Sequence, residues 1–242
     1  SFNFLYLSSG GLTALIALLC LFFFPNFKTE TKQITTLVLR RRYWLYYALQ
    51  FLSGARRQIF VVFASFMMVE KFGFEVHQLT ALFLINLVIN IFAAPLFGYF
   101  IAHFGERRAL LIEYSGLICV FLAYGGIYLF DWGVVLAATL FVLDHLFFGL
   151  RTALKTYFQK ISSPEDIAPT AAIALTINHI AAIFLPVLLG LLWLVSPAIV
   201  FIIAAFIAFL SLLLASLVPR RPVAGNETLL TSKTYSKYKV GQ

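Results

Sequence analysis

The chain has 242 residues, of which 62% are hydrophobic and only 12% are charged, and its mean hydropathy is +0.94. Soluble domains carry roughly 25% charged residues, so a water-soluble globular protein is excluded and lipid is the expected solvent. The formal net charge of +8 sits in short clusters between apolar runs, which argues against a nucleic-acid-binding protein.

Several apolar stretches are long enough to cross a membrane as helices, because a helix needs about 20 apolar residues to span roughly 30 Å of hydrocarbon. Runs such as Leu12–Phe24 are continuously apolar, whereas strands of a membrane barrel alternate over about ten residues. The sequence therefore predicts an all-α, polytopic transmembrane helix bundle. In chain order the predicted helices are Phe2–Phe24, Tyr43–Val69, Leu79–Ala102, Ala109–Phe130, Gly133–Phe158, Ala168–Leu194 and Pro197–Val218.

The loops between these helices differ sharply in charge. The loops on one side of the membrane contain a single Lys or Arg residue, Lys71, which lies in the loop Glu70–Gln78. By the positive-inside rule the other side is cytoplasmic, so we expect an integral protein of a plasma or inner membrane with its C-terminus in the cytoplasm. The basic residues of that side are Lys28, Lys32, Arg40, Arg41, Arg42, Arg107, Arg108, Lys160, Arg220, Arg221, Lys233, Lys237 and Lys239.

The longest polar connection, residues 25–42, predicts a boundary between two bundles. It separates a single transmembrane helix, residues 1–24, from a six-helix unit, residues 43–218. Residues 219–242 form a basic tail, which we expect to be disordered and to touch anionic lipid. Because Ser1 opens almost directly on an apolar run, with no basic region before it, we expect the chain to be a piece of a longer polypeptide.

Polar side chains inside the predicted helices follow a period of three helices. A charge at the bilayer centre costs about 2.5–3.5 kcal/mol on insertion scales and normally faces a cavity. The second and fifth helices carry most of these side chains, the third and sixth fewer, and the fourth and seventh almost none. This predicts two three-helix repeats whose leading helices line a shared cavity. The candidate substrate-binding and coupling residues are Arg56, Arg57, Gln58, Asn86, Asn90, Asp144, His145, Arg151, Asn178 and His179.

The charges of the fifth helix fall on one line if that helix is continuous. At about 100° per residue, Asp144, Arg151 and Lys155 lie within roughly 20° of each other. For each of these residue types a purely structural role is also consistent with the sequence. Lys155 and Arg151 could snorkel to the membrane surface, and the histidines could be buried with satisfied hydrogen bonds. The asparagines could simply link helices.

Residues Gly98–Arg108, between the third and fourth helices, resemble the signature loop of the major facilitator superfamily. That pattern is Gly, three residues, Asp, a basic residue, any residue, Gly and then a basic cluster. Ala102 stands in place of the Asp, His103 in place of the first basic residue, and Glu106 departs from the usual Arg. The residues that match are Gly98, Gly105, Arg107 and Arg108.

The resemblance implies that the seven segments are the sixth to twelfth helices of a twelve-helix transporter. Residues 1–24 then end an N-terminal half whose first five helices are missing from this chain, and residues 25–42 become the cytoplasmic linker between the halves. The implied function is secondary active transport of a small solute by alternating access. Arg107 and Arg108 would supply the cations of a cytoplasmic gating loop, with Glu113 as a local partner.

Within that function, Arg56, Arg57 and Arg151 are the candidate substrate-facing cations, which favours an anionic or strongly polar solute. Asp144 is the candidate for proton coupling, since a carboxyl group in a partly desolvated cavity can exchange a proton near physiological pH. His145 and His179 are the alternatives for this role.

Two other functions are consistent with parts of the sequence. The first is a non-transporting scaffold or sensor that keeps the fold. The second is a membrane-embedded, metal-dependent enzyme using Asp144, His145 and His179. The sequence has no HExxH motif, no Gly-x-Ser-x-Gly motif and no glycine-rich phosphate loop, and both cysteines, Cys20 and Cys119, lie inside apolar runs. We therefore expect no enzyme activity, metal or cofactor, and a small solute with protons as the partners.

Overall fold

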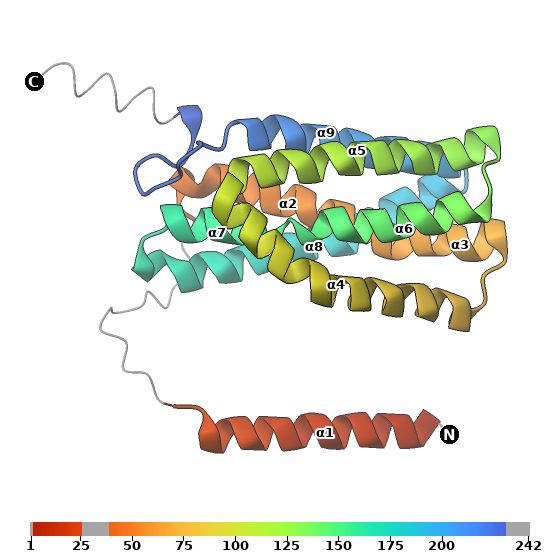
Figure 1. Ribbon diagram of the computed structural model, residues 1–242, viewed down its shortest axis with the longest axis horizontal. Helices are drawn as coiled ribbons and strands as arrows, with labels where there is room; N and C mark the ends of the chain where they lie inside the picture. The colour runs from red at the N-terminus through yellow and green to blue at the C-terminus, as the bar shows by residue number, and fades with distance from the viewer. Residues whose placement is uncertain (1, 26–38, 231–242) are drawn as a thin grey trace, which may run out of the picture. The chain divides into compact units, whose positions relative to one another are not determined.

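The computed structural model describes residues 2–25 and 39–230, and within them it is all-helical apart from turns and one isolated bridge. It has 7 helices long and apolar enough to cross a membrane, so the predicted bundle of seven spans is confirmed. The first, α1 (Phe2–Phe23), forms one compact unit, and the remaining helices form a second unit (Figure 1).

The second unit contains six spans, two of which are divided into shorter helices. Gly73, with φ 67°, ends the second span, and Gly105, with φ 85°, turns the chain between the third and fourth. Both conformations favour glycine because it lacks a Cβ atom. The helices are α2 (Trp44–Gln58), α3 (Ser65–Phe72), α4 (Val76–Phe104), α5 (Glu106–Phe130), α6 (Val134–Gly149), α7 (Thr152–Ile161), α8 (Ile167–Trp193) and α9 (Pro197–Ser216).

The helices of this bundle pack as two three-helix repeats of opposite direction. The leading helix α2 packs mainly on α8, the second helix of the other repeat, whereas α6 packs on both α4 and α5 of the other repeat. The third helices, α5 and α9, pack on each other more extensively than any other pair. This exchange of partners is the arrangement that the period of three in the polar residues predicted.

Both leading spans change helical geometry at corresponding positions. The α2 helix runs for 15 residues and continues as a π-helix over Ile59–Ala64, whereas α6 runs for 16 residues and breaks before α7. At the break, Leu150 and Arg151 donate their N–H groups to the carbonyls of Phe147 and Phe148, three residues back. The predicted span Gly133–Phe158 is confirmed as one span, Val134–Ile161, but it contains a two-residue turn between α6 and α7.

At the break, α4 packs closely against the end of α6. A Cβ atom added to Gly149 would lie 2.3 Å from the Phe97 ring of α4, so a glycine at the end of α6 lets α4 approach closely. Of the three charges predicted to share one helical face, Asp144 lies on α6, Arg151 in the turn and Lys155 on α7.

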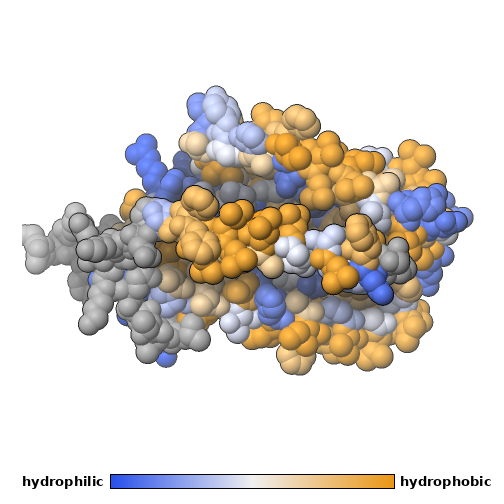
Figure 2. Space-filling view, turned by 90° about the horizontal axis from the view of Figure 1, so that it is seen from below, coloured by the Kyte–Doolittle hydropathy of each residue, from blue (hydrophilic) through white to orange (hydrophobic). Residues whose placement is uncertain are grey.

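Apolar side chains fill the bundle and also cover its flanks. One core cluster surrounds Phe121, Phe141 and Phe201, and a second surrounds Tyr114 and Tyr157. Many large apolar residues of α4 and α8 are exposed, and hydrophobic residues cover much of the face drawn in Figure 2. In a soluble protein such a surface would aggregate, whereas in a membrane it faces lipid or other apolar helices.

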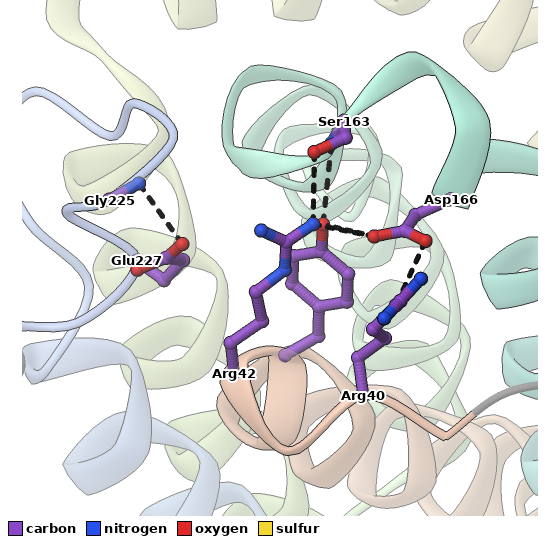
Figure 3. Close-up of polar contacts among 7 residues, drawn as sticks. Arg40, Arg42, Ser163, Asp166, Gly225 and Glu227 are labelled. Carbon is purple, nitrogen blue, oxygen red and sulfur yellow. Dashed lines mark hydrogen bonds and ion pairs between the residues drawn. The ribbon is translucent and has the colours of Figure 1, made fainter.

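One end of the bundle, the basic end, holds the start of α2, the α4–α5 turn, the end of α7 and the segment after α9. Asp166, just before α8, has a side chain only 4% exposed. Its carboxylate accepts hydrogen bonds from Arg40 at 3.0 Å, Arg42 at 2.5 Å and the Tyr43 hydroxyl at 3.0 Å (Figure 3). Charge-assisted bonds of this kind fix the start of α2 against the α7–α8 turn.

The segment after α9 folds back onto the basic end. The Tyr157 hydroxyl donates to the carbonyl of Glu227, and the N–H of Leu229 donates to the carbonyl of Leu217. The Glu227 side chain accepts a bond from the N–H of Gly225 (Figure 3). The prediction of a disordered tail is therefore wrong for residues 219–230, while residues 231–242 and the linker residues 26–38 lie outside the described part.

Candidate functional site

A cavity of about 660 Å³ opens between the two repeats, beside the break of the fifth span. Its walls come from both leading spans and both second helices, as expected for a cavity shared by the repeats. Arg151 and Lys155 line it, and none of its lining residues is acidic. The polar residues of its wall are Tyr46, Gln50, Asn90, His145, Arg151, Thr152, Lys155, Gln159 and Asn178.

The inner wall of this cavity is a hydrogen-bonded cluster that joins three helices. One Arg151 guanidinium nitrogen donates to the side-chain oxygens of Gln50 and Asn178, each at 3.3 Å. The Asn178 amide donates to Gln50 at 3.0 Å, and the Gln50 amide donates to the Tyr46 hydroxyl at 2.9 Å. Arg151 is held by neutral partners, and it makes no ion pair within the described residues. Its positive charge is therefore not balanced by an ion pair in this part of the chain.

A glycine on α2 makes this cluster possible. A Cβ atom added to Gly54 would lie 2.7 Å from the Asn178 side-chain oxygen and 3.1 Å from its Cα atom. Small residues let the backbones of membrane helices approach closely. Gly54 lies one turn after Gln50, so the same face of α2 provides both the close approach and the hydrogen bonds.

Arg56 is buried in the bundle and does not line the cavity. Its side chain is 1% exposed, and two of its nitrogens approach one Glu113 oxygen at 3.4 and 3.5 Å. The guanidinium also lies over the Tyr114 ring, 4.4 Å from its centroid, a favourable cation–π position. Glu113 thus pairs with Arg56 across the bundle, and the expected pairing with Arg107 or Arg108 is not found.

Asp144 and Asn86 are also buried side chains away from the cavity wall. Asp144 is 2% exposed and Asn86 is 1% exposed. Among the described residues, one Asp144 oxygen and both polar atoms of the Asn86 amide lack a hydrogen-bond partner. Buried polar atoms without partners are uncommon in folded proteins.

The other candidates divide between the cavity and the surface. Asn90 and His145 line the cavity together with Arg151 and Asn178. Arg57, next to the buried Arg56, is exposed, and Gln58 is half-buried. His179 is exposed, and its ring nitrogen contacts the carbonyl of Leu175. Four of the ten candidates thus line the cavity. The other six, including Arg57 and His179, do not.

Gln50 and Tyr46 belong to the cavity wall but were not among the candidates. A usable signal was present, because Gln50 is a polar residue inside a predicted span and Gly54 follows one turn later. Tyr46 gave no such signal, since a tyrosine near a membrane surface is ordinarily read as an interfacial anchor.

The signature loop lies at the basic end, apart from the cavity. Gly98 is on α4, Gly105 forms the turn, and Arg107 and Arg108 lie in the first turn of α5. Arg107 and Arg108 face a hollow shared with the segment after α9. Glu106 is 2% exposed and pairs with Lys160 of α7 at 2.6 Å, so the loop is tied to the end of the fifth span.

Inverted three-helix repeats around a polar cavity are typical of a class of membrane proteins, the secondary transporters. The sequence model of the Major Facilitator Superfamily matches residues 46–239, and the chain belongs to this family. No curated protein matches the chain. Membership confirms the resemblance of the signature loop and implies transmembrane transport of a solute rather than enzyme activity.

Within the described residues no three His, Cys, Asp or Glu side chains gather into a group that could hold a metal ion.

Proposed function

We propose that the protein is a secondary active transporter that moves a polar or anionic solute by alternating access, coupled to protons. The observation that supports this most strongly is the cavity at the break of the fifth span. Irregular backbone at membrane depth is tolerated where it lines a water-filled cavity, and the break carries Arg151 into the cavity wall. The basic end then faces the cytoplasm by the positive-inside rule.

The charge of the cavity favours an anionic solute. Arg151 and Lys155 line it, no carboxylate does, and neither cation has an ion-pair partner among the described residues. A guanidinium presents paired N–H donors in a plane that matches a carboxylate or phosphate. Gln50 and Asn178 hold the Arg151 head group in place, which lowers the entropy cost of binding.

Asp144 is the proposed site of proton coupling. It is a buried carboxyl on α6, six residues before the helix break, and one of its oxygens has no partner in the described part of the chain. A carboxyl without a fixed partner can take up and release a proton as alternating access changes its contact with water. His145, next in sequence, lines the cavity and offers a route between Asp144 and the solute.

Flux into proteoliposomes tests both parts of the proposal. A panel of carboxylates, phosphates, neutral sugars and cations is offered with and without a pH gradient. We expect an anion to be taken up, Arg151→Gln to reduce its uptake at least tenfold, and Arg41→Gln, at an exposed site, to leave uptake unchanged. Asp144→Asn should remove the response to the pH gradient while solute exchange continues. Uptake of cations only, or full gradient response in Asp144→Asn, would contradict the proposal.

A further inference from the structure

The hollow at the basic end has a geometry that the transport proposal does not use. It has a volume of about 490 Å³ and is lined by residues of the α4–α5 turn and of the segment after α9. A Cβ atom added to Gly105 would lie 3.9 Å from the carbonyl oxygen of Arg220, so the two segments are neighbours. The hollow is lined by Phe104, Gly105, Arg107, Arg108, Leu111, Arg220 and Arg221.

The charge of this hollow is uncompensated. Four of its lining residues are arginines, and none of them makes an ion pair within residues 39–230. The carboxylate next to it, Glu106, is buried and already paired with Lys160. A second hollow of about 560 Å³ shares Arg220 and Arg221 and adds His103. Clustered like charges repel each other, so an anion between them would be bound favourably.

The backbone contributes further donors. The α5 helix begins beside the hollow, and its N-cap, Gly105, provides no side-chain hydrogen bond. The first N–H groups of a helix have no acceptor within it, and the helix dipole favours an anion there. The hollow therefore combines free backbone N–H groups with arginine side chains, which together form a common phosphate-binding arrangement.

The arginines after α9 are held in place by the folded segment that carries them. The Asn226 side chain donates to the carbonyl of Arg221 at 3.3 Å, and Asn226 forms a bridge with Val223. The N–H of Leu229 is bonded to Leu217 in the last turn before this segment. Two arginines from one segment and two from another thus converge because of tertiary structure, and the chain orders them before any ligand binds.

The side of the hollow that continues along α5 is apolar. Phe104 is 43% exposed and Ile112 is 44% exposed, and Leu111 lines the hollow itself. A cationic site at the end of a membrane helix, flanked by exposed apolar side chains, suits a molecule with a charged head and hydrocarbon chains.

We propose that this basic hollow binds a phosphate group, supplied by the headgroup of an acidic phospholipid at the membrane edge. The phosphate lies among Arg107, Arg108, Arg220 and Arg221, and the acyl chains follow the apolar surface of α5. Binding would join the α4–α5 turn to the segment after α9, and the site is independent of the solute cavity.

The test measures lipid binding to the purified full chain in detergent by native mass spectrometry. Phosphatidylglycerol and phosphatidylcholine are titrated against the wild type, the double variant Arg220→Ala/Arg221→Ala and the control Arg41→Ala. Arg41 is exposed at the same end and makes no ion pair among the described residues. We expect phosphatidylglycerol to bind at least tenfold more tightly than phosphatidylcholine, and the double variant to lose roughly 25-fold, or about fivefold per arginine.

A second arm separates the two sources of phosphate. Inorganic phosphate is added at up to 10-fold excess over the lipid. If phosphatidylglycerol stays bound over this whole range, the site is assigned to the lipid. Displacement at equal concentration assigns it to a soluble phosphate, still within the proposed chemistry. Equal binding of both lipids with no phosphate binding, or equal losses in the double variant and Arg41→Ala, would overturn the proposal.

Discussion

Removing one partner of the buried Arg56–Glu113 pair should strongly destabilise the bundle. Both side chains are almost fully buried, with exposures of 1% and 0%. The contact distances of 3.4 and 3.5 Å are long, and the Arg56 Nε atom and the second Glu113 oxygen have no partner in the described structure. The pair is thus held together mainly by charge, so the loss of one member leaves the other unpaired in an apolar surrounding.

The expected magnitude follows from that burial. Arg56→Met keeps the length of the side chain and removes the charge, and it should cost about 3–5 kcal/mol. Glu113→Gln should cost a similar amount, because the cation–π contact with Tyr114 alone cannot compensate a buried guanidinium. For a chain of this size each kcal/mol corresponds to roughly 2–4 °C in Tm, so each single variant should melt roughly 6–20 °C lower. The double variant should recover to within about 1 kcal/mol of the wild type, because no unpaired charge remains.

Thermal unfolding of the purified protein in detergent, followed by circular dichroism, measures these shifts. Arg57→Met is the matched control, since Arg57 is adjacent in sequence and exposed, and it should stay within about 0.5 kcal/mol of the wild type. If Arg56→Met and Arg57→Met lower the Tm equally, the burial of Arg56 does not govern its contribution to stability. Additive losses in the double variant would show that Arg56 and Glu113 are not coupled.

Two further variants probe helix packing and the loop between α5 and α6. Gly54→Ala should destabilise the bundle by about 1–3 kcal/mol, because the methyl group would meet the Asn178 backbone. Thermal unfolding measures the loss, and wild-type stability would contradict it. Lys71, 2.8 Å from Asp131, lowers the pKa of Asp131 below its usual 3.8. Asp131→Asn should therefore be less stable than the wild type at neutral pH, and the difference should disappear as the pH falls through that lowered pKa. A difference that persists at low pH would refute this assignment.

The spans and the family could be predicted from the sequence because their signals are local. A continuous apolar run of about 20 residues satisfies its own backbone hydrogen bonds as a helix in lipid, whatever its neighbours are. The signal for the α4–α5 turn is also local, because it depends on one residue, Gly105, which adopts a positive φ between two helices. The period of three in the polar residues also predicted the repeats correctly, because leading helices occupy equivalent positions in both.

The break of the fifth span could not be predicted in this way. The sequence becomes more polar after Gly149, with Arg151, Thr152 and Lys155, but a polar helix end near the membrane surface has the same composition whether or not the helix turns there. Phe97 of α4 occupies the space beside Gly149, and this contact between residues far apart in the chain is not visible in the local sequence. The folded segment 219–230 was missed for the same reason, because its polar composition is that of a tail and its hydrogen bonds are made with α7 and the end of α9.

The sequence by itself determined that charges lie at membrane depth on two helices, and the tertiary structure decided which of them are available. Arg56 and Arg57 are adjacent and chemically identical, yet one is buried against Glu113, 57 positions away, and the other is exposed. Composition and spacing are properties of one helix, whereas the burial of a side chain is set by the neighbouring helix that covers it. In the same way Arg151 lines the cavity because Gln50 and Asn178, on two other helices, hold it there.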